Sequence, residues 1–312
     1  MGDSGRHLGG AWLSDSALGF LHEHPRHAAQ LTGCACYSLA RRPHHRAIRS
    51  RVENWPGFLE RSGIYLSFDY NAVPGDYQYR ALTSGHPVQR FWHAGKLRVI
   101  DRLLRPHVRA GSYLLEIGCG AGNLLLHATV GGSYPVALDL AMPSLMFVRS
   151  RLQESRVGSD PPRGFACTQA LSDRLPMVDS SFDCVLLSEV IEHLEAPHLT
   201  IREAARVLRP GGRLLVTTPN YRSFWPAMEW AVDRLGSAPK MAGEQHITRF
   251  HARSLRQLLL ESGLRIQHFG TIYTLSPFLA LASPALASRR LAREIANKSS
   301  LGMILVAVAS KP

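Results

Sequence analysis

From residue 113 onward, short apolar runs alternate with helix-like stretches, and no other feature restricts the possible folds as strongly. Runs of strand length lie at 113–118, 135–140, 164–169, 182–190 and 213–220, and two more follow towards the end of the chain. Helix-like stretches start near Gly122 and Pro143 and occupy 199–208, ended by Pro210-Gly211-Gly212, and 253–263. Alternation of this kind predicts an α/β fold, a parallel sheet covered by helices on both faces.

The first apolar run leads into LLEIGCGAG, residues 114–122, with glycines at Gly118, Gly120 and Gly122. A glycine turn between a strand and a helix lets backbone approach a ligand, which fits dinucleotides, nucleoside triphosphates and S-adenosylmethionine (SAM). A phosphate loop needs Gly-Lys-Ser/Thr, and Gly122 is followed by Asn123 instead. The dinucleotide spacing G-x-G-x-x-G is also absent. Asp139, at the tip of the next strand, suits a ribose, the alternative being a cap for the helix near Pro143.

Four segments in chain order are more specific than the glycine turn: LLEIGCGAGNLL, ALDLAMPSL, LPMVDSSFDCVLLSEVIEHL and RVLRPGGRLLVTTPN. They cover roughly residues 113–220 and resemble the class I SAM-dependent methyltransferases, particularly the small-molecule branch similar to ubiquinone and menaquinone biosynthesis enzymes. The resemblance implies a Rossmann-like sheet of seven strands, mostly parallel with an antiparallel last strand, and SAM as the cofactor.

The resemblance also implies roles for residues. Those implied to bind the cofactor are Glu116, Gly118, Cys119, Gly120, Gly122, Asp139, Leu140, Ser172 and Glu189. Asp139 would hold the ribose, and Leu140 would flank the adenine. Leu171 departs from the family pattern, because it stands where an acid often binds the adenine amino group. Gln169 or Asp173 substitutes for that acid, or apolar contact and backbone hold the adenine.

Methyl transfer displaces a sulfonium carbon in line, so the protein mainly supplies alignment. A general base is needed only for a poor nucleophile such as a phenol, an alcohol or an acidic C–H group. The candidates for this catalytic role are His193, His246 and Glu192, although His193 also suits the edge of the core. The aromatic insert 221–235 either walls an apolar acceptor pocket or packs as ordinary core.

We expect O- or C-methylation of a small, apolar or lipid-like acceptor of quinol or phenol type. The alternatives are a nucleic-acid or protein methyltransferase and a non-catalytic SAM-binding regulator. The formal net charge of +12 is compatible with nucleic acid or an anionic membrane. Nucleic acid is not expected, because SEVIEHL follows the fourth strand in place of an Asn/Asp-Pro-Pro-Tyr/Phe motif. The stretch 274–298, apolar and then arginine-rich, suggests peripheral contact with an anionic membrane, a lid, or a dimer contact.

Five cysteines without a disulfide spacing indicate a reducing compartment, and no secretory signal precedes them, so we expect a cytoplasmic protein, peripheral at the membrane if 274–298 contacts lipid. No metal is predicted, because Cys34 and Cys36 with His44 and His45 fit no zinc spacing. The oligomeric state is left open. The predicted organisation is a poorly ordered basic extension at 1–60, a helical lead-in at 61–110, and the methyltransferase domain at 111–312, with inserts at 221–249 and 273–298.

Overall fold

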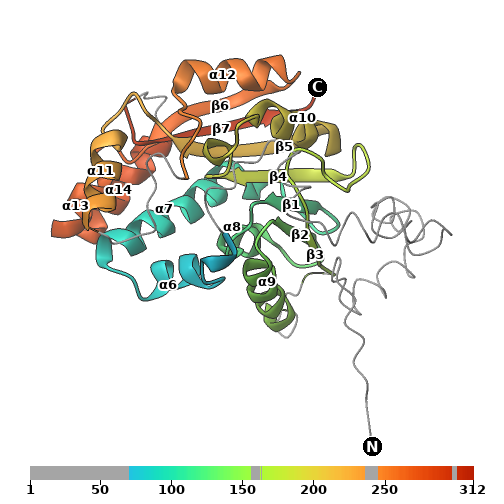
Figure 1. Ribbon diagram of the computed structural model, residues 1–312, viewed down its shortest axis with the longest axis horizontal. Coiled ribbons are helices and arrows are strands. Elements are labelled where there is room, and N and C mark those ends of the chain that lie inside the picture. The colour runs from blue at the N-terminus through green and yellow to red at the C-terminus, as the bar shows by residue number, and fades with distance from the viewer. Residues whose placement is uncertain (1–69, 156–161, 163, 236–244, 297–300) are drawn as a thin grey trace, which may run out of the picture.

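The structure is a computed structural model that describes residues 70–155, 162, 164–235, 245–296 and 301–312 (Figure 1). The predicted extension at 1–60, including Cys34, Cys36, His44 and His45, lies outside the described residues. The predicted domain boundaries therefore stay predictions.

A seven-stranded sheet forms the centre of the described chain, in the order β3-β2-β1-β4-β5-β7-β6. The strands are β1 Tyr113–Ile117, β2 Tyr134–Asp139, β3 Ala166–Gln169, β4 Phe182–Ser188, β5 Leu208–Pro219, β6 Arg265–Ile272 and β7 Ile304–Ser310. The pairs from β3 to β5 are parallel, and β7 is antiparallel to both β5 and β6. The Rossmann-like fold with an antiparallel last strand is confirmed.

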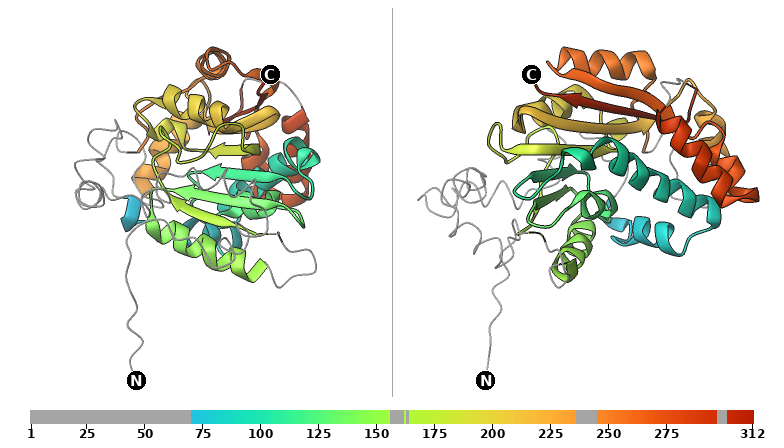
Figure 2. Two further views of the ribbon diagram at one scale, coloured as in Figure 1. Left: turned by 90° about the vertical axis from the view of Figure 1, so that its right-hand side faces the viewer. Right: turned by 180° about the vertical axis from the view of Figure 1, so that it is seen from behind.

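Helices cover both faces of this sheet (Figures 1 and 2). One face carries α10 Pro197–Val207 and α12 Ala252–Glu261, which bury Ile201, Leu255 and Leu259 against it. The opposite face carries α7 Pro87–Leu103, α8 Asn123–Ala128, α9 Met142–Ser155 and α14 Pro284–Ala296. The two apolar cores follow from the strands, since successive side chains such as Leu114 and Leu115 point to opposite faces.

The order of the strands determines where a ligand can bind. The chain leaves β1 towards β2 and β3 on one side and then returns to place β4 on the other side of β1. Open α/β sheets bind ligands outside the carboxyl ends of their strands at such a reversal. The glycine turn after β1, Asp139 at the end of β2 and Glu189 after β4 all lie at this edge.

The remaining helices are α6 Tyr77–Thr83, α11 Trp225–Leu235 and α13 Ser276–Ala282, with three-residue turns η2 Tyr70–Ala72, η3 Arg105–His107 and η4 Ile191–His193. Figure 1 shows α11, α13 and α14 gathered at one end of the sheet. This is the carboxyl edge of the parallel strands, because α11 follows β5 and α13 follows β6.

The predicted end of the helix at 199–208 is wrong in one detail. The helix already ends at Val207, and residues 208–212 continue as the start of β5, where Leu208 pairs with Phe182. Gly211 has a positive φ of 78°, so the Pro-Gly-Gly run bends a strand and does not stop the helix directly. No helix in the described part of the chain is both long and apolar enough to cross a bilayer.

Candidate functional site

The glycine turn adopts a backbone that other residues rarely adopt. Gly118, Gly120 and Gly122 have φ values of 68°, 48° and 68°. A Cβ on Gly118 would lie 2.5 Å from the side chain of Val190, and one on Gly120 would lie 2.5 Å from Gln78 of α6. The turn is therefore a cradle of bare backbone at the switch point, as the close approach of a ligand requires.

One hydrogen bond ties Asp139 to this turn, and a second ties it to the backbone that follows β2. The backbone N–H of Gly120 donates to its Oδ2, and the backbone N–H of Ala141 donates to its Oδ1, each at 2.8 Å. Burial raises the pKa of the Asp139 carboxyl, while these backbone donors act in the opposite direction. The residue implied to bind the ribose thus also shapes the turn.

Glu116 and Cys119 lie beneath the turn. Glu116 is 3% exposed, and its Oε2 accepts a hydrogen bond of 3.0 Å from the backbone N–H of Leu125 in α8. Burial raises the pKa of this carboxyl to about 8, so the folded protein holds a readily protonated acid there. Cys119 is a buried free thiol whose Sγ lies 3.8 Å from the carbonyl oxygen of Gly120.

Gln169 ends β3, and Leu171 and Ser172 follow it, where the resemblance implies that the adenine lies. The Gln169 amide donates from Nε2 to the backbone carbonyl of Leu140 at 2.8 Å. Leu171 is buried, so this position offers only apolar contact. The Ser172 hydroxyl lies 2.9 Å from that of Thr200 in α10, which directs it into the fold. Gln169 therefore positions the backbone beside which the adenine is implied to lie.

A small cavity of about 40 Å³ lies between the glycine turn and the lead-in helix α7, lined by Gln78, His93, Lys96, Glu116, Gly118, Cys119, Asn123, Leu124, Ser188 and Glu189. Lys96 of α7 forms an ion pair with the Glu189 carboxylate across it. Burial, with the Lys96 charge, lowers the pKa of His93 to about 3. Glu189 itself has a positive φ of 55°, and its N–H donates to the carbonyl of Thr217.

All three predicted catalytic residues meet beyond Glu189. Ligating atoms of Glu192, His193 and His246 lie within 4.8 Å of one another. Glu192 and His193 belong to η4 after β4, whereas His246 lies past β5 and α11. The backbone N–H groups of Ile247 and Thr248 donate to the Glu192 carbonyl and hold the two segments together.

The hydrogen bonds of the cluster fix which nitrogens carry protons. His193 Nδ1 lies 2.7 Å from the Gln245 carbonyl, which can only accept, so Nδ1 donates there, and the ring has a second hydrogen bond to the backbone of Glu189. Burial, with the charge of His246, lowers the pKa of His193 to about 4. Burial raises the pKa of Glu192 to about 7, and one of its oxygens, Oε1, has no hydrogen-bond partner in the described structure.

His246 is oriented by Glu229 of α11, with 2.5 Å between His246 Nδ1 and Glu229 Oε1. Tyr221 donates its hydroxyl to the same carboxylate oxygen at 2.8 Å. Burial alone would lower the pKa of His246, but the hydrogen bond to Glu229 and the nearby Glu192 carboxylate outweigh burial and raise it. The hydrogen bonds from His246 and Tyr221 likewise outweigh burial at Glu229 and lower the pKa of that carboxyl.

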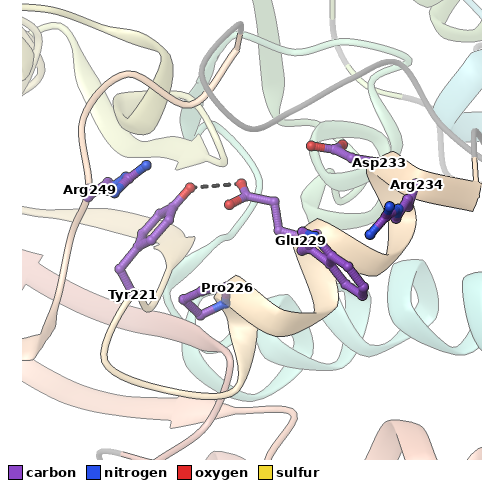
Figure 3. A pocket seen from close by; sticks show the side chains of 7 residues that line it. Tyr221, Pro226, Glu229, Asp233, Arg234 and Arg249 are labelled. Carbon is purple, nitrogen blue, oxygen red and sulfur yellow. Dashed lines mark hydrogen bonds between the residues drawn. The ribbon is translucent and has the colours of Figure 1, made fainter.

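Glu229 of this dyad lines an open groove of about 630 Å³, together with Tyr221, Pro226, Trp230, Asp233, Arg234 and Arg249, and His246 lies buried behind it. Figure 3 shows Glu229 and Tyr221 facing one another, with the hydrogen bond between them drawn. The Arg249 guanidinium lies 5.5 Å from the centre of the Tyr221 ring. The predicted aromatic insert therefore does line a pocket, although Trp225 is 7% exposed and packs into the core.

The sequence analysis missed two residues of the site. Lys96 contacts Glu189 from α7, 93 positions earlier in the chain. The sequence feature that could have indicated Lys96 is the rarity of lysine in an arginine-rich chain. Glu229 lies within the apolar insert 221–235, and a carboxylate among aromatic residues is the sequence feature that could have indicated it. The donor set of Glu192, His193 and His246 also suits a divalent cation, a possibility that the sequence analysis did not consider.

Comparison with known proteins agrees with this geometry. The model of the methyltransferase domain family matches residues 86–268. A ubiquinone biosynthesis O-methyltransferase of Xylella fastidiosa is 30% identical over 165 residues, which cover 50% of this chain and 65% of that protein. A probable S-adenosylmethionine-dependent methyltransferase of Mycobacterium tuberculosis is 30% identical over 176 residues, 56% of each chain. The matches thus span less than two thirds of these relatives.

Among solved structures, a SAM-dependent methyltransferase of Thermotoga maritima, titled a possible histamine N-methyltransferase, aligns with a TM-score of 0.51 at 18% identity. The alignment covers 76% of this chain and 95% of that one, which shows a shared fold. The methyltransferase domain model matches more than half of the chain. The glycine cradle, the buried carboxylates and the order of the strands agree with that match. The chain therefore belongs to the family of SAM-dependent methyltransferase domains.

Proposed function

We propose that the protein transfers the methyl group of SAM to a hydroxyl oxygen of a small, apolar or lipid-like acceptor of phenol or quinol type. The observation that carries this proposal is the His246–Glu229 dyad, which stands between the groove along α11 and the Glu192–His193 turn beside the cofactor cavity. A hydroxyl acceptor is the kind that needs such a base. The name of the Xylella relative, an O-methyltransferase, supports the same choice of atom.

The residues proposed to hold SAM lie at or just after the carboxyl ends of β1 to β4, from the methionine end to the adenine: Glu189, Glu116, Gly118, Cys119, Gly120, Gly122, Asp139, Leu140 and Ser172. SAM supplies a sulfonium carbon that is open to displacement once bound. The protein then contributes alignment, which can account for about 7–11 kcal/mol of the barrier.

The acceptor proton passes to Nε2 of His246 in this proposal. Glu229 accepts from Nδ1 and stabilises the imidazolium that forms, and the Glu192 carboxylate adds to that effect. His193 stays neutral, because burial lowers its pKa to about 4, and its Nδ1 donates to the Gln245 carbonyl. A positioned base of this kind accelerates proton transfer about 10²–10⁴-fold.

The test is transfer of a labelled methyl group from SAM into a fractionated cell extract. We expect the label in the organic-soluble or small-molecule pool, and less of it with His246→Gln. Label in the RNA or protein pool would support the rival macromolecular methyltransferase and make the basic charge the main clue. No label in any pool, with SAM still bound, would support a non-catalytic SAM-binding regulator.

A divalent cation held by Glu192, His193 and His246 is a second candidate for the same cluster. Each histidine already donates its other ring nitrogen to an oxygen, as metal-binding histidines commonly do. The unpartnered Glu192 Oε1 is a further acceptor for a cation. Such an ion would polarise the acceptor oxygen when bound.

Chelation separates the two candidates. If the cluster is a base alone, dialysis against EDTA leaves both the turnover and the thermal midpoint unchanged. If it holds a cation, EDTA lowers both, and added Mg²⁺, Mn²⁺ or Zn²⁺ restores them in the parent protein and not in Glu192→Gln.

A further inference from the structure

We propose that the α13–α14 hairpin is a docking surface for an anionic lipid bilayer, independent of whether the acceptor is the one proposed above. This hairpin surface consists of Phe224, Leu275, Phe278, Leu281 and Leu286, together with Arg289 and Arg293 of α14. It lies at the end of the molecule where Figures 1 and 2 show α13 and α14 side by side.

The surface is apolar where it is most exposed. Leu275, Phe278, Leu281 and Leu286 are 51%, 43%, 68% and 52% exposed. The whole of α13, SPFLALA, contains no charged residue. The spacing of 275, 278 and 281–282 places these side chains on one face of the helix, opposite the buried Pro277 and Ala280. A helix that buries one apolar face and exposes another needs a second apolar environment.

The apolar area continues from α13 onto the start of α11. The Phe224 and Phe278 rings are 6.4 Å apart in an edge-on arrangement, and Phe224 is 65% exposed. Trp230, further along α11, is also exposed and lines the groove beside Glu229. The same helix therefore joins the hairpin surface to the groove.

The charges beside this area are positive. Arg289 and Arg293 lie on the exposed face of α14, one and two turns after Leu286, and make no ion pair with any described residue. Residues 274–296 hold a single carboxylate, Glu294, and it is 3% exposed. Glu294 turns inward to accept hydrogen bonds from the N–H groups of Tyr273, Leu275 and Ser276, and it pairs with Arg290.

An anionic bilayer is the occupant that this charge pattern fits. Apolar side chains can enter the acyl boundary while arginines lie at the level of the phosphates. A second copy of the same surface would bring the same unneutralised arginines, because a two-fold interface pairs a patch with itself. At 7 and 13 residues, the two helices suit a position in the interface plane.

Docking in this way would place the groove at the bilayer surface. An acceptor with an isoprenoid or acyl tail could then reach Glu229 and His246 without leaving the lipid. This last step rests on the proposed function, whereas the docking itself does not.

The experiment is co-sedimentation of the full chain with vesicles, without SAM or acceptor. Vesicles of phosphatidylcholine with one quarter phosphatidylglycerol are compared with pure phosphatidylcholine, at low and high salt. Two double variants are tested, Phe278→Ser with Leu281→Ser, and Arg289→Gln with Arg293→Gln. The matched control is Leu260→Ser with Arg253→Gln on α12, where Leu260 is 55% exposed on a different helix.

We expect the parent protein and the control to sediment with anionic vesicles only. The arginine variant should bind about 25-fold more weakly at low salt, roughly fivefold for each arginine removed. The loss should be small at high salt, where surface charge is screened. The Phe278–Leu281 variant should bind at least about tenfold more weakly at both salt concentrations, because each buried apolar side chain adds to partitioning.

Equal binding of the parent and both variants would overturn the proposal, as would a parent protein that stays in the supernatant or binds neutral vesicles equally well. A concentration-dependent dimer that the Phe278–Leu281 variant abolishes would also overturn it in favour of a second copy. Circular dichroism and thermal unfolding of each variant exclude misfolding as a cause. Because binding is scored without methyl transfer, failure of the proposed function leaves the result interpretable.

Discussion

Asp139 has two roles that single substitutions can separate. Its carboxylate accepts the backbone N–H of Gly120 in the turn and that of Ala141 after β2, so Asp139→Ala would leave both donors without this partner. Asp139→Asn keeps one side-chain oxygen and a similar volume. Loss of the charged acceptor should weaken binding of S-adenosylhomocysteine about 10- to 100-fold, since hydrogen bonds to a charged group contribute about 1.5–3 kcal/mol.

Isothermal titration calorimetry measures this affinity directly. Asp101→Asn is the matched control, because Asp101 lies near the end of α7 and its carboxylate pairs with Arg105 and His127, none of which is proposed to bind the cofactor. Unchanged affinity in Asp139→Asn would remove the ribose role and leave Asp139 as part of the turn alone.

The His246–Glu229 dyad makes a prediction about pH. A base acts when it is deprotonated, and the pKa of His246 is raised above its ordinary value by Glu229 and Glu192 despite burial. Turnover should therefore rise as the pH rises through this pKa. Glu229→Gln removes a carboxylate that stabilises the imidazolium and so lowers the pKa of His246. In the pH profile of turnover, the rise at acidic pH should therefore move to lower pH, and the maximal rate should fall about 10- to 100-fold.

The pH profile of kcat, with the affinity for S-adenosylhomocysteine measured alongside, distinguishes this from a purely structural role. Tyr221→Phe is the comparison variant, because it keeps both charged members of the dyad and removes a hydroxyl that donates to Glu229 and lies 3.1 Å from His246 Nδ1, so it should move the acidic rise less than Glu229→Gln. If Glu229→Gln lowers the maximal rate and leaves the pH of the acidic rise unchanged, Glu229 supports the fold and does not set the pKa of His246.

At the scale of elements, the sequence predicted the strands well because each carries its own local signal. The runs at Tyr113–Ile117 and Phe182–Ser188 are buried strands bounded by turns, and the order of motifs fixed their direction. Contacts between distant elements carry no such signal. The pair of Lys96 with Glu189 and the dyad of His246 with Glu229 depend on how α7 and α11 pack. For the segment 273–298 the sequence showed only an apolar and then arginine-rich composition, and the two helices α13 and α14 were not predicted.

Gly95 of α7 is one such packing contact. A Cβ at this position would collide with the Tyr273 hydroxyl and lie 2.9 Å from Leu291. Tyr273 stacks on Trp92 with ring centres 4.2 Å apart and donates its hydroxyl to the Trp92 carbonyl. Gly95→Ala should therefore destabilise the protein by about 1–3 kcal/mol. Helix propensity alone would predict the opposite effect, because replacing glycine with alanine inside a helix stabilises a protein by up to about 1 kcal/mol.

A double-mutant cycle with Tyr273→Phe tests this reason, with denaturant unfolding as the measurement. Removing the hydroxyl relieves the shortest contact, while Tyr273 Cε1 and Leu291 still lie 2.9 Å from the new Cβ, so the double variant should be more stable than the sum of the two single effects predicts. The coupling should be about 1 kcal/mol or more. Additive effects would mean that the alanine clashes elsewhere or that α7 shifts freely.

At the scale of the whole molecule, the lead-in helices close over the cofactor edge of the sheet. Gln78 of α6 lies against Gly120, its carbonyl accepts a hydrogen bond from Asn123, and Lys96 of α7 pairs with Glu189. The cavity that remains between them is about 40 Å³. SAM is far larger, so we expect α6 and the start of α7 to move away as it enters and then to pack against it.

Hydrogen–deuterium exchange can detect this movement. We expect backbone amides of residues 77–96 to exchange about tenfold or more slowly with saturating S-adenosylhomocysteine, since the bound ligand replaces an open state with a packed one. Peptides from α12, which packs on the other face of the sheet, serve as the internal control and should not change. Lys96→Met should speed exchange of the same segment without ligand, because the closing ion pair is lost. Tight binding without any change in 77–96 would mean that the cofactor enters by another route and that these helices are fixed.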